Sequence, residues 1–422
     1  MSDETAAYPD LGLDWYATDA PGVGGKLKTR PEDFRVVERA DFPYGEEGRY
    51  AVVRAELRNY ETHEFARDLS NALGASRKRV SWAGTKDKRA VTTQIFTVAD
   101  VSRDEVESVS LEGASVEYLG RSHQYVSLGD LLGNDFVVRL RDADAPENAD
   151  VIADEIDAFG GVPNLFGTQR FGSRRPVTHA VGERILADDF EGAVDAYVAD
   201  YYEDEPERTQ EARKRYAEER DPKDALDYFP EHLGYERALL HALADGKEGR
   251  ETLDALPHNL RRMFVNAVQS RVFNLVLRER NDAGMRFNRA YPGDVVCFAE
   301  EADGVRVPDT SNTQRVTESN VEAINRHVER GRAFVTAPLV GSETEFGDGE
   351  QGETERRVLE KVGISRDDFD RDDEYGSEGT RRAIVVRPEL SYEREGDDIL
   401  FDFFLPRGSY ATVVLREFTK SG

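Results

Sequence analysis

Short runs in which apolar and polar residues alternate dominate roughly the first 170 residues of the chain. Alternation in runs rich in Val, Phe and Tyr is typical of strands that place one face in a core. We therefore predict strands at residues 34–39, 49–57, 94–98, 115–119 and 135–140.

Two segments of the same region have helical spacing instead. Residues 62–73 place Phe65 and Leu69 four positions apart, with Thr62 as the predicted cap. Residues 149–159 carry a second helical stripe. Because strands and helices do not follow the regular rhythm of a parallel βαβ array, the pattern favours an α+β domain with a mainly antiparallel sheet.

From about residue 180 the pattern changes to longer helical segments joined by acidic connections. The clearest predicted helices span residues 189–202 and 260–279, with a charged stretch at 203–223 between them. Two runs of Asp, Glu and Gly, at 341–355 and 366–379, have the composition of solvated loops. The middle of the chain is thus predicted to be rich in helices.

Strand patterns return near the C-terminus, at residues 382–386, 399–405 and 411–415. A β-rich tail after a helical middle predicts that the middle is a helix-rich α+β insertion and that the tail rejoins the first sheet. We place the first part, the insertion domain and the C-terminal part at residues 1–187, 188–378 and 379–422.

The composition is strongly acidic, with 84 Asp and Glu against 56 Lys and Arg in 422 residues, a formal net charge of −28. This length exceeds what one hydrophobic core usually supports, so two domains are expected. Dense surface carboxylates keep a protein soluble in a high-salt cytoplasm. Because concentrated salt screens distant charges, local basic patches are expected to decide whether the chain binds nucleic acid.

A single cysteine, Cys297, excludes an internal disulfide and a thiolate zinc cluster. The seven His residues lack metal-ligand spacing, so we expect no metal site, although carboxylate-bound Mg²⁺ stays open. The N-terminus lacks a basic start and an apolar run, and no stretch approaches the roughly 18 apolar residues of a membrane span. We expect a cytoplasmic protein without membrane association.

The most unusual local feature is the segment RKRVSWAGTKDKR at residues 77–89, which holds six basic residues and one carboxylate, Asp87. Neighbouring cations favour the ionised form of a carboxylate, which suits a nucleophile or a general base. The same cations attract a phosphate backbone. A charged turn between two strands is the structural alternative. The segment indicates an Asp-dependent enzyme acting on nucleic acid, with backbone contacts expected from Lys86, Lys88 and Arg89.

Residues 163–172, PNLFGTQRFG, form a second candidate site. They combine the amide of Asn164, the ring of Phe166 and the cation of Arg170, a set that can stack on a flipped base, hydrogen-bond to its edge and contact the RNA backbone. The alternative is a glycine-punctuated loop with its aromatic side chains in the core.

Residues 26–34 place Lys28 and two further cations ahead of the strand that begins with Phe34, which fits phosphate contact and equally an ordinary turn before a strand. The polar face of the 260–279 helix offers a further RNA-binding surface. The turn at 406–412 has no accompanying Ser/His/Asp arrangement, and the chain lacks both GxGxxG and Walker loops. Hydrolase triads and dinucleotide or P-loop sites are therefore excluded.

Together these segments resemble the tRNA pseudouridine synthase D (TruD) family, in an archaeal, halophile-like form. They follow the family order and cover nearly the whole chain. The resemblance implies a mainly antiparallel α+β catalytic domain that is interrupted by an insertion domain. The matching segments are PEDF (31–34), VVE (36–38), AGTKDKRAVTTQ (83–94), PNLFGTQRFG (163–172), AVQSRVFN (267–274), TAPLVGSE (336–343) and LPRGSYATVVLRE (405–417).

The resemblance also implies roles for individual residues. Asp87 falls on the position of the catalytic aspartate. Phe166 matches the aromatic residue that packs on the target base, and Asn164 matches a pocket amide that helps to hold the catalytic loop. Lys28 and Phe34 fall on pocket positions of the family.

The reaction implied by the resemblance is the isomerisation of a tRNA uridine, at position 13, to its C-glycoside without a cofactor. Asp87 can attack C1′ of the sugar or remove the C2′ proton, and the resemblance favours the second route, through a glycal. We expect tRNA as the partner and a monomer that needs no other protein. A catalytically silent tRNA-binding or RNA-folding protein and a base-excising glycosylase are the alternatives.

Overall fold

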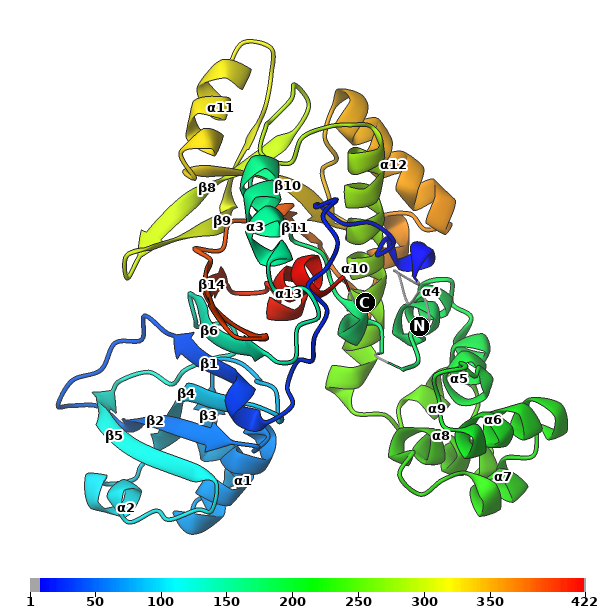
Figure 1. Ribbon diagram of the computed structural model, residues 1–422. Helices are drawn as coiled ribbons and strands as arrows, with labels where there is room; N and C mark the ends of the chain where they lie inside the picture. Colours follow the sequence, from blue (N-terminus) through cyan, green and yellow to red (C-terminus); the bar gives the residue numbers. More distant parts are fainter. Residues whose placement is uncertain (1–7, 173, 421–422) are drawn as a thin grey trace.

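The computed structural model describes residues 8–172 and 174–420, and its main feature is a mixed sheet of eight strands (Figure 1). The strand order is β13-β14-β6-β1-β4-β2-β5, and β3 pairs with β4. Among the described residues only β1 and β4 pair in parallel in this sheet, so the sheet is mainly antiparallel, as the sequence predicts. The strands are β1 (Phe34–Arg39), β2 (Tyr50–Arg58), β3 (Val80–Trp82), β4 (Val91–Ala99), β5 (Ala114–Ser122), β6 (Gly133–Leu140), β13 (Ser391–Glu395) and β14 (Asp398–Pro406).

One face of this sheet is covered by α1 (Thr62–Ala72) and α2 (Arg103–Glu107). The predicted stripe of α1 is confirmed, because Phe65 and Leu69 are fully buried in a core shared with β2 and β4. The predicted cap is wrong by one position: the Glu61 carboxylate accepts the first helical amide hydrogens. The Thr62 hydroxyl instead hydrogen-bonds to Gln94 on β4, which ties the start of the helix to the sheet.

The middle of the chain contains a second, four-stranded sheet in the order β11-β10-β8-β9 and most of the helices. Strand β12, which follows β11 in the chain, pairs instead with β7, far earlier in the sequence. The predicted helices at 189–202 and 260–279 are confirmed as α5 and α10. The bounds are β7 (Val162–Pro163), β8 (Val295–Ala302), β9 (Val305–Arg315), β10 (Ala333–Leu339), β11 (Thr380–Ala383), β12 (Val385–Val386), α3 (Asn148–Phe159), α4 (Thr178–Leu186), α5 (Phe190–Ala199), α6 (Glu207–Glu219), α7 (Pro222–Tyr228), α8 (Gly234–Ala244), α9 (Gly249–Leu253), α10 (His258–Asp282), α11 (Val321–Glu329) and α12 (Gly349–Val362).

The long helix α10 organises the middle of the molecule (Figure 1). It packs along α4 and contacts α12 and β10, so it links the helical part to the four-stranded sheet. Gly182 of α4 allows the closest approach, because a Cβ atom there would lie 2.2 Å from the backbone oxygen of Phe264. The apolar face predicted for this helix is confirmed, with Phe264, Val268 and Val272 fully buried.

Two acidic runs were predicted as solvated loops. Run 366–379 is a loop with one short turn, Asp367–Phe369, and keeps most of its carboxylates exposed, as predicted, whereas run 341–355 is largely folded into the protein. Helix α12 begins inside the first run, and its Glu355 is fully buried with Arg381 at 3.2 Å. In the second run the aromatic ring of Tyr375 is fully buried. The prediction is wrong for the first run, because its buried ion pair offsets the polar composition.

The C-terminal strands return to the first sheet, as predicted, since β14 pairs with β6 from Ile399 to Pro406. The predicted strand at 382–386 is divided between two sheets, with β11 on β10 and β12 on β7. The predicted strand at 411–415 is wrong: these residues begin helix α13 (Ala411–Thr419), which buries Val414 and Phe418. No helix in the described part of the chain is long and apolar enough to cross a membrane.

Candidate active site

Asp87 lies in the loop between β3 and β4, at the wall of a cavity of about 460 Å³. The cavity is formed by β1, the start of β6, the Asp87 loop and the turn that leads from β14 into α13. Its apolar wall includes Phe34, Val36 and Phe136, and its polar wall includes the Asp87 loop. The size and the mixed lining suit one nucleotide held against a carboxylate.

Lys28 is the partner of Asp87, although 59 positions separate them in the chain. The Nζ atom of Lys28 lies 2.5 Å from Oδ2 of Asp87 and 4.2 Å above the centre of the Phe34 ring. Lys28 has a φ of 52°, a left-handed conformation that is uncommon for a residue with a side chain. The Asp87 side chain keeps 43% of its surface exposed, so the ion pair fixes the carboxylate without covering it.

A second ion pair, which is buried, holds the Asp87 loop against the sheet. Nζ of Lys86 donates to Glu38 at 2.7 Å, and the side chains are 8% and 0% exposed. The other oxygen of Glu38 accepts the backbone amide of Ile95 on β4. Lys86 was predicted to contact the RNA backbone, but in the structure its charge is taken up inside the protein. Its burial assigns it to holding the loop.

Two hydrogen bonds of the backbone complete this support. The amide of Lys86 donates to the Thr62 hydroxyl at 3.1 Å, and the Gln94 side chain donates to the Gly84 carbonyl at 2.7 Å. Since Thr62 also donates to Gln94, the loop, helix α1 and strand β4 form one connected network. The loop that carries Asp87 is therefore fixed at both the side-chain and the backbone level.

Lys88 and Arg89, the other predicted RNA-backbone contacts in this loop, lie at its surface. Lys88 is 55% exposed and pairs with Glu64 at 2.8 Å, a contact that lowers the pKa of the Glu64 carboxyl. Arg89 is exposed and donates to the carbonyl of Thr29. Both cations are exposed next to the Asp87 carboxylate, where an incoming phosphate can reach them.

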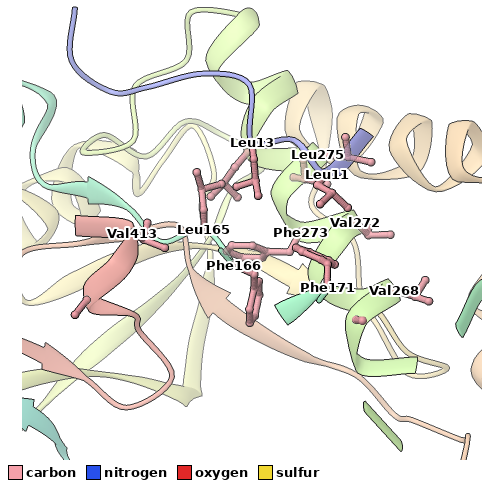
Figure 2. Packing of buried hydrophobic residues seen from close by; sticks show 14 of the residues in the cluster. Leu11, Leu13, Leu165, Phe166, Phe171, Val268, Val272, Phe273, Leu275 and Val413 are labelled. Atoms are coloured by element: carbon pink, nitrogen blue, oxygen red, sulfur yellow. The ribbon is translucent and has the colours of Figure 1, made fainter. Parts of the chain in front are cut away.

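Phe166 and Asn164 lie behind the cavity wall. Each is 5% exposed, and Figure 2 shows the Phe166 ring in the cluster with Leu165, Phe171 and Phe273. The backbone of Phe166 is clamped to α10, because the side chain of Asn274 both accepts its amide hydrogen at 2.8 Å and donates to its carbonyl at 2.9 Å. Residues 164–166 are thus buried and held against α10.

Two arginines approach the Phe166 ring. The guanidinium of Arg382 lies 4.2 Å from the ring centre, and that of Arg170 lies 5.7 Å away. Arg170, a predicted backbone contact, donates to the Ser270 hydroxyl at 3.0 Å. Desolvation lowers the pKa of both guanidinium groups, that of Arg382 to about 10.

The side chain of Asn164 is turned towards β11. Its amide donates to the carbonyl of Ala383 at 2.9 Å, and its carbonyl accepts from Arg382 at 2.5 Å. Arg382 also donates to the carbonyl of Gly408 at 2.6 Å, so it joins the 163–172 segment to the turn after β14. Arg382 thus links Asn164 to the turn that lines the Asp87 cavity.

The structure brings Lys28, Phe34, Lys86 and Lys88 around Asp87, whereas Asn164, Phe166 and Arg170 form the layer behind. Sequence reasoning missed the residues that the turn after β14 and its neighbours bring to the cavity. The available signal was the turn at 406–412, which lies in the family-matching segment 405–417 but was assigned no site residue. The missed cavity residues are Asn134, Gln169, Arg407, Ser409, Tyr410 and Thr412.

Among the described residues, no group of three or more His, Cys, Asp and Glu side chains could hold a metal ion. Cys297 is buried, which raises the pKa of its thiol to about 12. The polar groups at the cavity are thus a carboxylate, amides, hydroxyls and cations.

Comparisons with known proteins find relatives that match nearly the whole chain. The family model for "tRNA pseudouridine synthase D (TruD)" matches residues 10–418. Proteins named "Probable tRNA pseudouridine synthase D" from Halobacterium salinarum and Natronomonas pharaonis are both 50% identical to the chain; the matches cover 97% and 100% of it, and 96% and 99% of the relatives.

A crystal structure of the Methanosarcina mazei protein, also named as a tRNA pseudouridine synthase D (TruD), superimposes with a TM-score of 0.82 at 42% identity. The match covers 100% of this chain and 98% of that one. With a carboxylate poised in a cavity and full-length matches in sequence and structure, the chain belongs to the tRNA pseudouridine synthase D (TruD) family.

Proposed function

We propose that the protein isomerises uridine to pseudouridine in tRNA, at position 13, with Asp87 as the catalytic carboxylate and without a cofactor. The observation that carries the proposal is the Asp87–Lys28 pair at the wall of a nucleotide-sized cavity, in a chain of this family. Position 13 is the target implied by the family resemblance.

The chemistry needs few protein groups. The N1–C1′ bond of uridine breaks, a C5–C1′ bond forms, C5 loses its proton and N1 gains one, so the atoms balance without an external reagent. The Asp87 carboxylate either bonds to C1′ or removes the C2′ proton. We favour the second route, through a glycal, in which the protonated carboxyl returns that proton to C2′ as the C5–C1′ bond forms. The Lys28 ammonium holds the carboxylate in the orientation that either route requires.

The cavity also keeps the detached uracil close to the sugar. Phe34, Val36 and Phe136 form an apolar wall, against which a planar base can turn without leaving. Lys88, Arg89 and Arg407 lie around the cavity and the Asp87 loop as candidate phosphate contacts. They supply the binding energy that offsets the cost of unstacking the uridine, a few kcal/mol.

We also propose the three-part division at residues 1–187, 188–378 and 379–422, with the insertion closing over the tRNA. It is supported by the return of β14 to the first sheet and by a separate four-stranded sheet, of which β8, β9 and β10 lie within 188–378 and the edge strand β11 lies just after that boundary. After β11, which is hydrogen-bonded to β10, the chain leaves the four-stranded sheet and returns to the first sheet. We expect a monomer that acts without another protein.

The experiment is to incubate the purified protein with unmodified tRNA transcripts in concentrated KCl. Pseudouridine is then mapped by carbodiimide adducts that stop reverse transcription. We expect one strong stop, at position 13. A stop at a different uridine would correct the target position but leave the isomerase assignment in place.

Two other outcomes would overturn the isomerase assignment. A catalytically silent tRNA-binding or RNA-folding protein would bind the transcript and give no carbodiimide stop. A base-excising glycosylase would leave an abasic site, which aniline cleaves. The intact Asp87 loop, fixed by its two ion pairs, argues against a silent relative.

A further inference from the structure

We propose that Arg387 binds a backbone phosphate of the tRNA, in a second cavity that lies next to the end of strand β14. This inference rests on the proposed tRNA substrate and adds a contact outside the reacting nucleotide. It assigns a role to a side chain that no motif in the sequence singled out.

Arg387 carries a half-buried positive charge without a partner. It follows β12 directly, and the pairing of β12 with β7 fixes its backbone. Its Nε atom is buried, and the guanidinium forms no hydrogen bond, ion pair or ring contact with any described residue. Desolvation lowers the pKa of Arg387, and no carboxylate in the described part of the chain counteracts this shift. Because an unpaired charge inside a protein is costly, it indicates a ligand that supplies the negative charge.

The other desolvated arginines of the molecule have partners within the protein. Arg381 pairs with Glu355 at 3.2 Å, and Arg175 pairs with Glu236 at 3.3 Å. Among the described arginines whose pKa is lowered by desolvation, Arg387 alone lacks such a contact. Its position is therefore not explained by packing within the chain.

Two neighbouring cavities, of about 510 and 400 Å³, share Arg387 in their walls. The guanidinium lies beside the turn between α11 and β10, since an added Cβ at Gly331 would be 3.6 Å from its Nη1 atom. The larger cavity also has Arg330 in its wall, together with the aromatic residues Phe334 and Phe404. Cations and aromatic rings around a cavity of this size suit a nucleotide unit.

Three glutamates line the larger cavity as well, but all of them are exposed: Glu301, Glu329 and Glu389. Glu301 already pairs with Arg306 at 3.5 Å. Water and salt screen exposed carboxylates far more than they screen a partly buried cation, so Arg387 remains the attractive charge for a phosphate. The carboxylates can accept a hydrogen bond from the 2′-hydroxyl of an RNA ribose.

The place of the cavity favours the tRNA backbone over a free nucleotide as the source of the phosphate. Phe404 and Pro406 of β14 line this cavity, and residues 407–412, which follow them directly, line the Asp87 cavity. An RNA strand that delivers a uridine to Asp87 can therefore place one of its other phosphates at Arg387.

The first test is phosphate-ethylation interference. tRNA that is sparsely ethylated at its phosphates is bound to wild type and to Arg387→Met, and the ethylated positions that are depleted from the bound fraction are mapped. In wild type we expect interference at a phosphate outside the target nucleotide, and Arg387→Met should lose the interference at that phosphate alone. Identical maps for the two proteins would overturn the proposal.

The second test measures tRNA affinity over a range of KCl concentrations. Arg387→Met should weaken binding by about tenfold and lower the slope of log Kd against log salt by about one, because one charged contact is lost. The matched control is Arg208→Met, since Arg208 is exposed on α6, which lies well away from β14 in Figure 1. Equal losses of affinity in the two variants would overturn the proposal.

Denaturant unfolding checks that Arg387→Met folds and that the charge has no structural partner. Because the unpaired charge is costly in the folded protein, the variant should be at least as stable as wild type. A clear loss of stability would show that Arg387 has a structural role and would overturn the proposal.

Calorimetry with uridine 5′-monophosphate tests the free nucleotide as the source. Binding that Arg387→Met abolishes, together with unchanged interference maps, would assign the cavity to a free nucleotide and overturn the tRNA contact. A wild-type protein that binds tRNA but forms no pseudouridine would overturn the proposed function and leave the interference test of Arg387 valid.

Discussion

At the scale of single residues, the site depends on contacts between positions that are far apart in the chain. Asp87 and Lys28 are separated by 59 positions, and Lys86 and Glu38 by 48. The sequence identified Asp87 and Lys28 separately, through local charge and family motifs. It did not indicate that Lys86 is buried, because a lysine within a basic run is usually solvated, and only the fold places Glu38 beneath it.

The Lys28 ammonium is expected to orient the reactive carboxylate. Lys28→Met removes the cation 2.5 Å from Asp87 and should slow single-turnover pseudouridine formation by about 10- to 100-fold, because small displacements of a reacting group are costly. The control is Lys26→Met, whose partner Asp142 is, like Lys26, 70% exposed. Equal effects of the two variants would show that the ion pair has no special role.

His179 gives a residue-level prediction for stability. Burial, together with the nearby Arg271 charge, lowers the pKa of its imidazole to about 4, from an ordinary 6.5. Between these values the unfolded chain takes up a proton that the folded protein excludes. The stability contributed by neutral His179 is therefore complete above pH 6.5 and falls as the pH drops towards 4, by up to about 3 kcal/mol.

The measurement is the free energy of unfolding of wild type and His179→Gln at pH 7 and pH 5. Because Gln does not titrate, the variant should lose less stability than wild type over this interval. Parallel losses in the two proteins would contradict the argument for His179. Comparing the two proteins cancels the titration of all other groups to first order.

At the scale of elements, alternation was a reliable guide to strands and four-residue spacing to helices. Both β1 and α10 were predicted because their apolar residues repeat with a clear period. The segment 411–415 was predicted as a strand but is part of a helix, because the short apolar run ATVVL fits a strand or a buried helix equally well. Contacts of α13 with α3 and β7 select the helix, and they come from distant parts of the chain.

That error explains why Tyr410 was missed. A residue at the start of a strand would have its side chain fixed by the sheet, whereas Tyr410 stands just before α13, at the end of a turn that faces the cavity. The family motif that covers residues 405–417 drew attention to the segment. It did not show which of its side chains reaches the Asp87 cavity.

The contact between α4 and α10 is predicted to depend on Gly182. Alanine is the better helix former by about 1 kcal/mol. Even so, Gly182→Ala should destabilise the protein by about 1–3 kcal/mol, because the new Cβ would lie 2.2 Å from the Phe264 carbonyl oxygen. Denaturant unfolding measures this change.

Gly234 is the matched control for this substitution. It is the first residue of α8 and has no atom within 4 Å of an added Cβ, so Gly234→Ala should change stability by less than about 0.5 kcal/mol. A Gly182→Ala protein as stable as wild type would mean that the two helices can separate at little cost.

At the scale of the whole molecule, the acidic composition predicted a protein adapted to salt. It also led to the prediction of a solvated loop at 341–355, where part of the buried core lies. With 84 acidic residues, a run of Asp and Glu looks like any other solvated surface. In the structure a few of these acidic side chains form buried ion pairs, as Glu355 does with Arg381. Sequence composition cannot make this choice, because each pair depends on the packing of α12 against β11 and its neighbours.

The arrangement of the whole molecule brings the two candidate motifs into adjacent layers. The first sheet supplies Asp87, and α10 together with β11 supports the Phe166 segment behind the cavity. The turn from β14 to α13 connects the layers through Arg382 and Gly408. The order of the motifs in the sequence showed that they follow one family pattern. Only the fold shows that the Asp87 loop lines the cavity while the Phe166 segment supports it from behind.

The most direct test of the account is the action of Asp87→Asn on tRNA tritiated at C5 of its uridines. Asparagine keeps the size of the side chain but removes the charge that Lys28 binds, and C5 must lose its hydrogen for pseudouridine to form. With wild-type protein, we predict release of tritium equivalent to one uridine per tRNA. Asp87→Asn should bind tRNA with similar affinity and release no tritium above background. Tritium release by Asp87→Asn at the wild-type rate would contradict the assignment of Asp87 as the catalytic carboxylate.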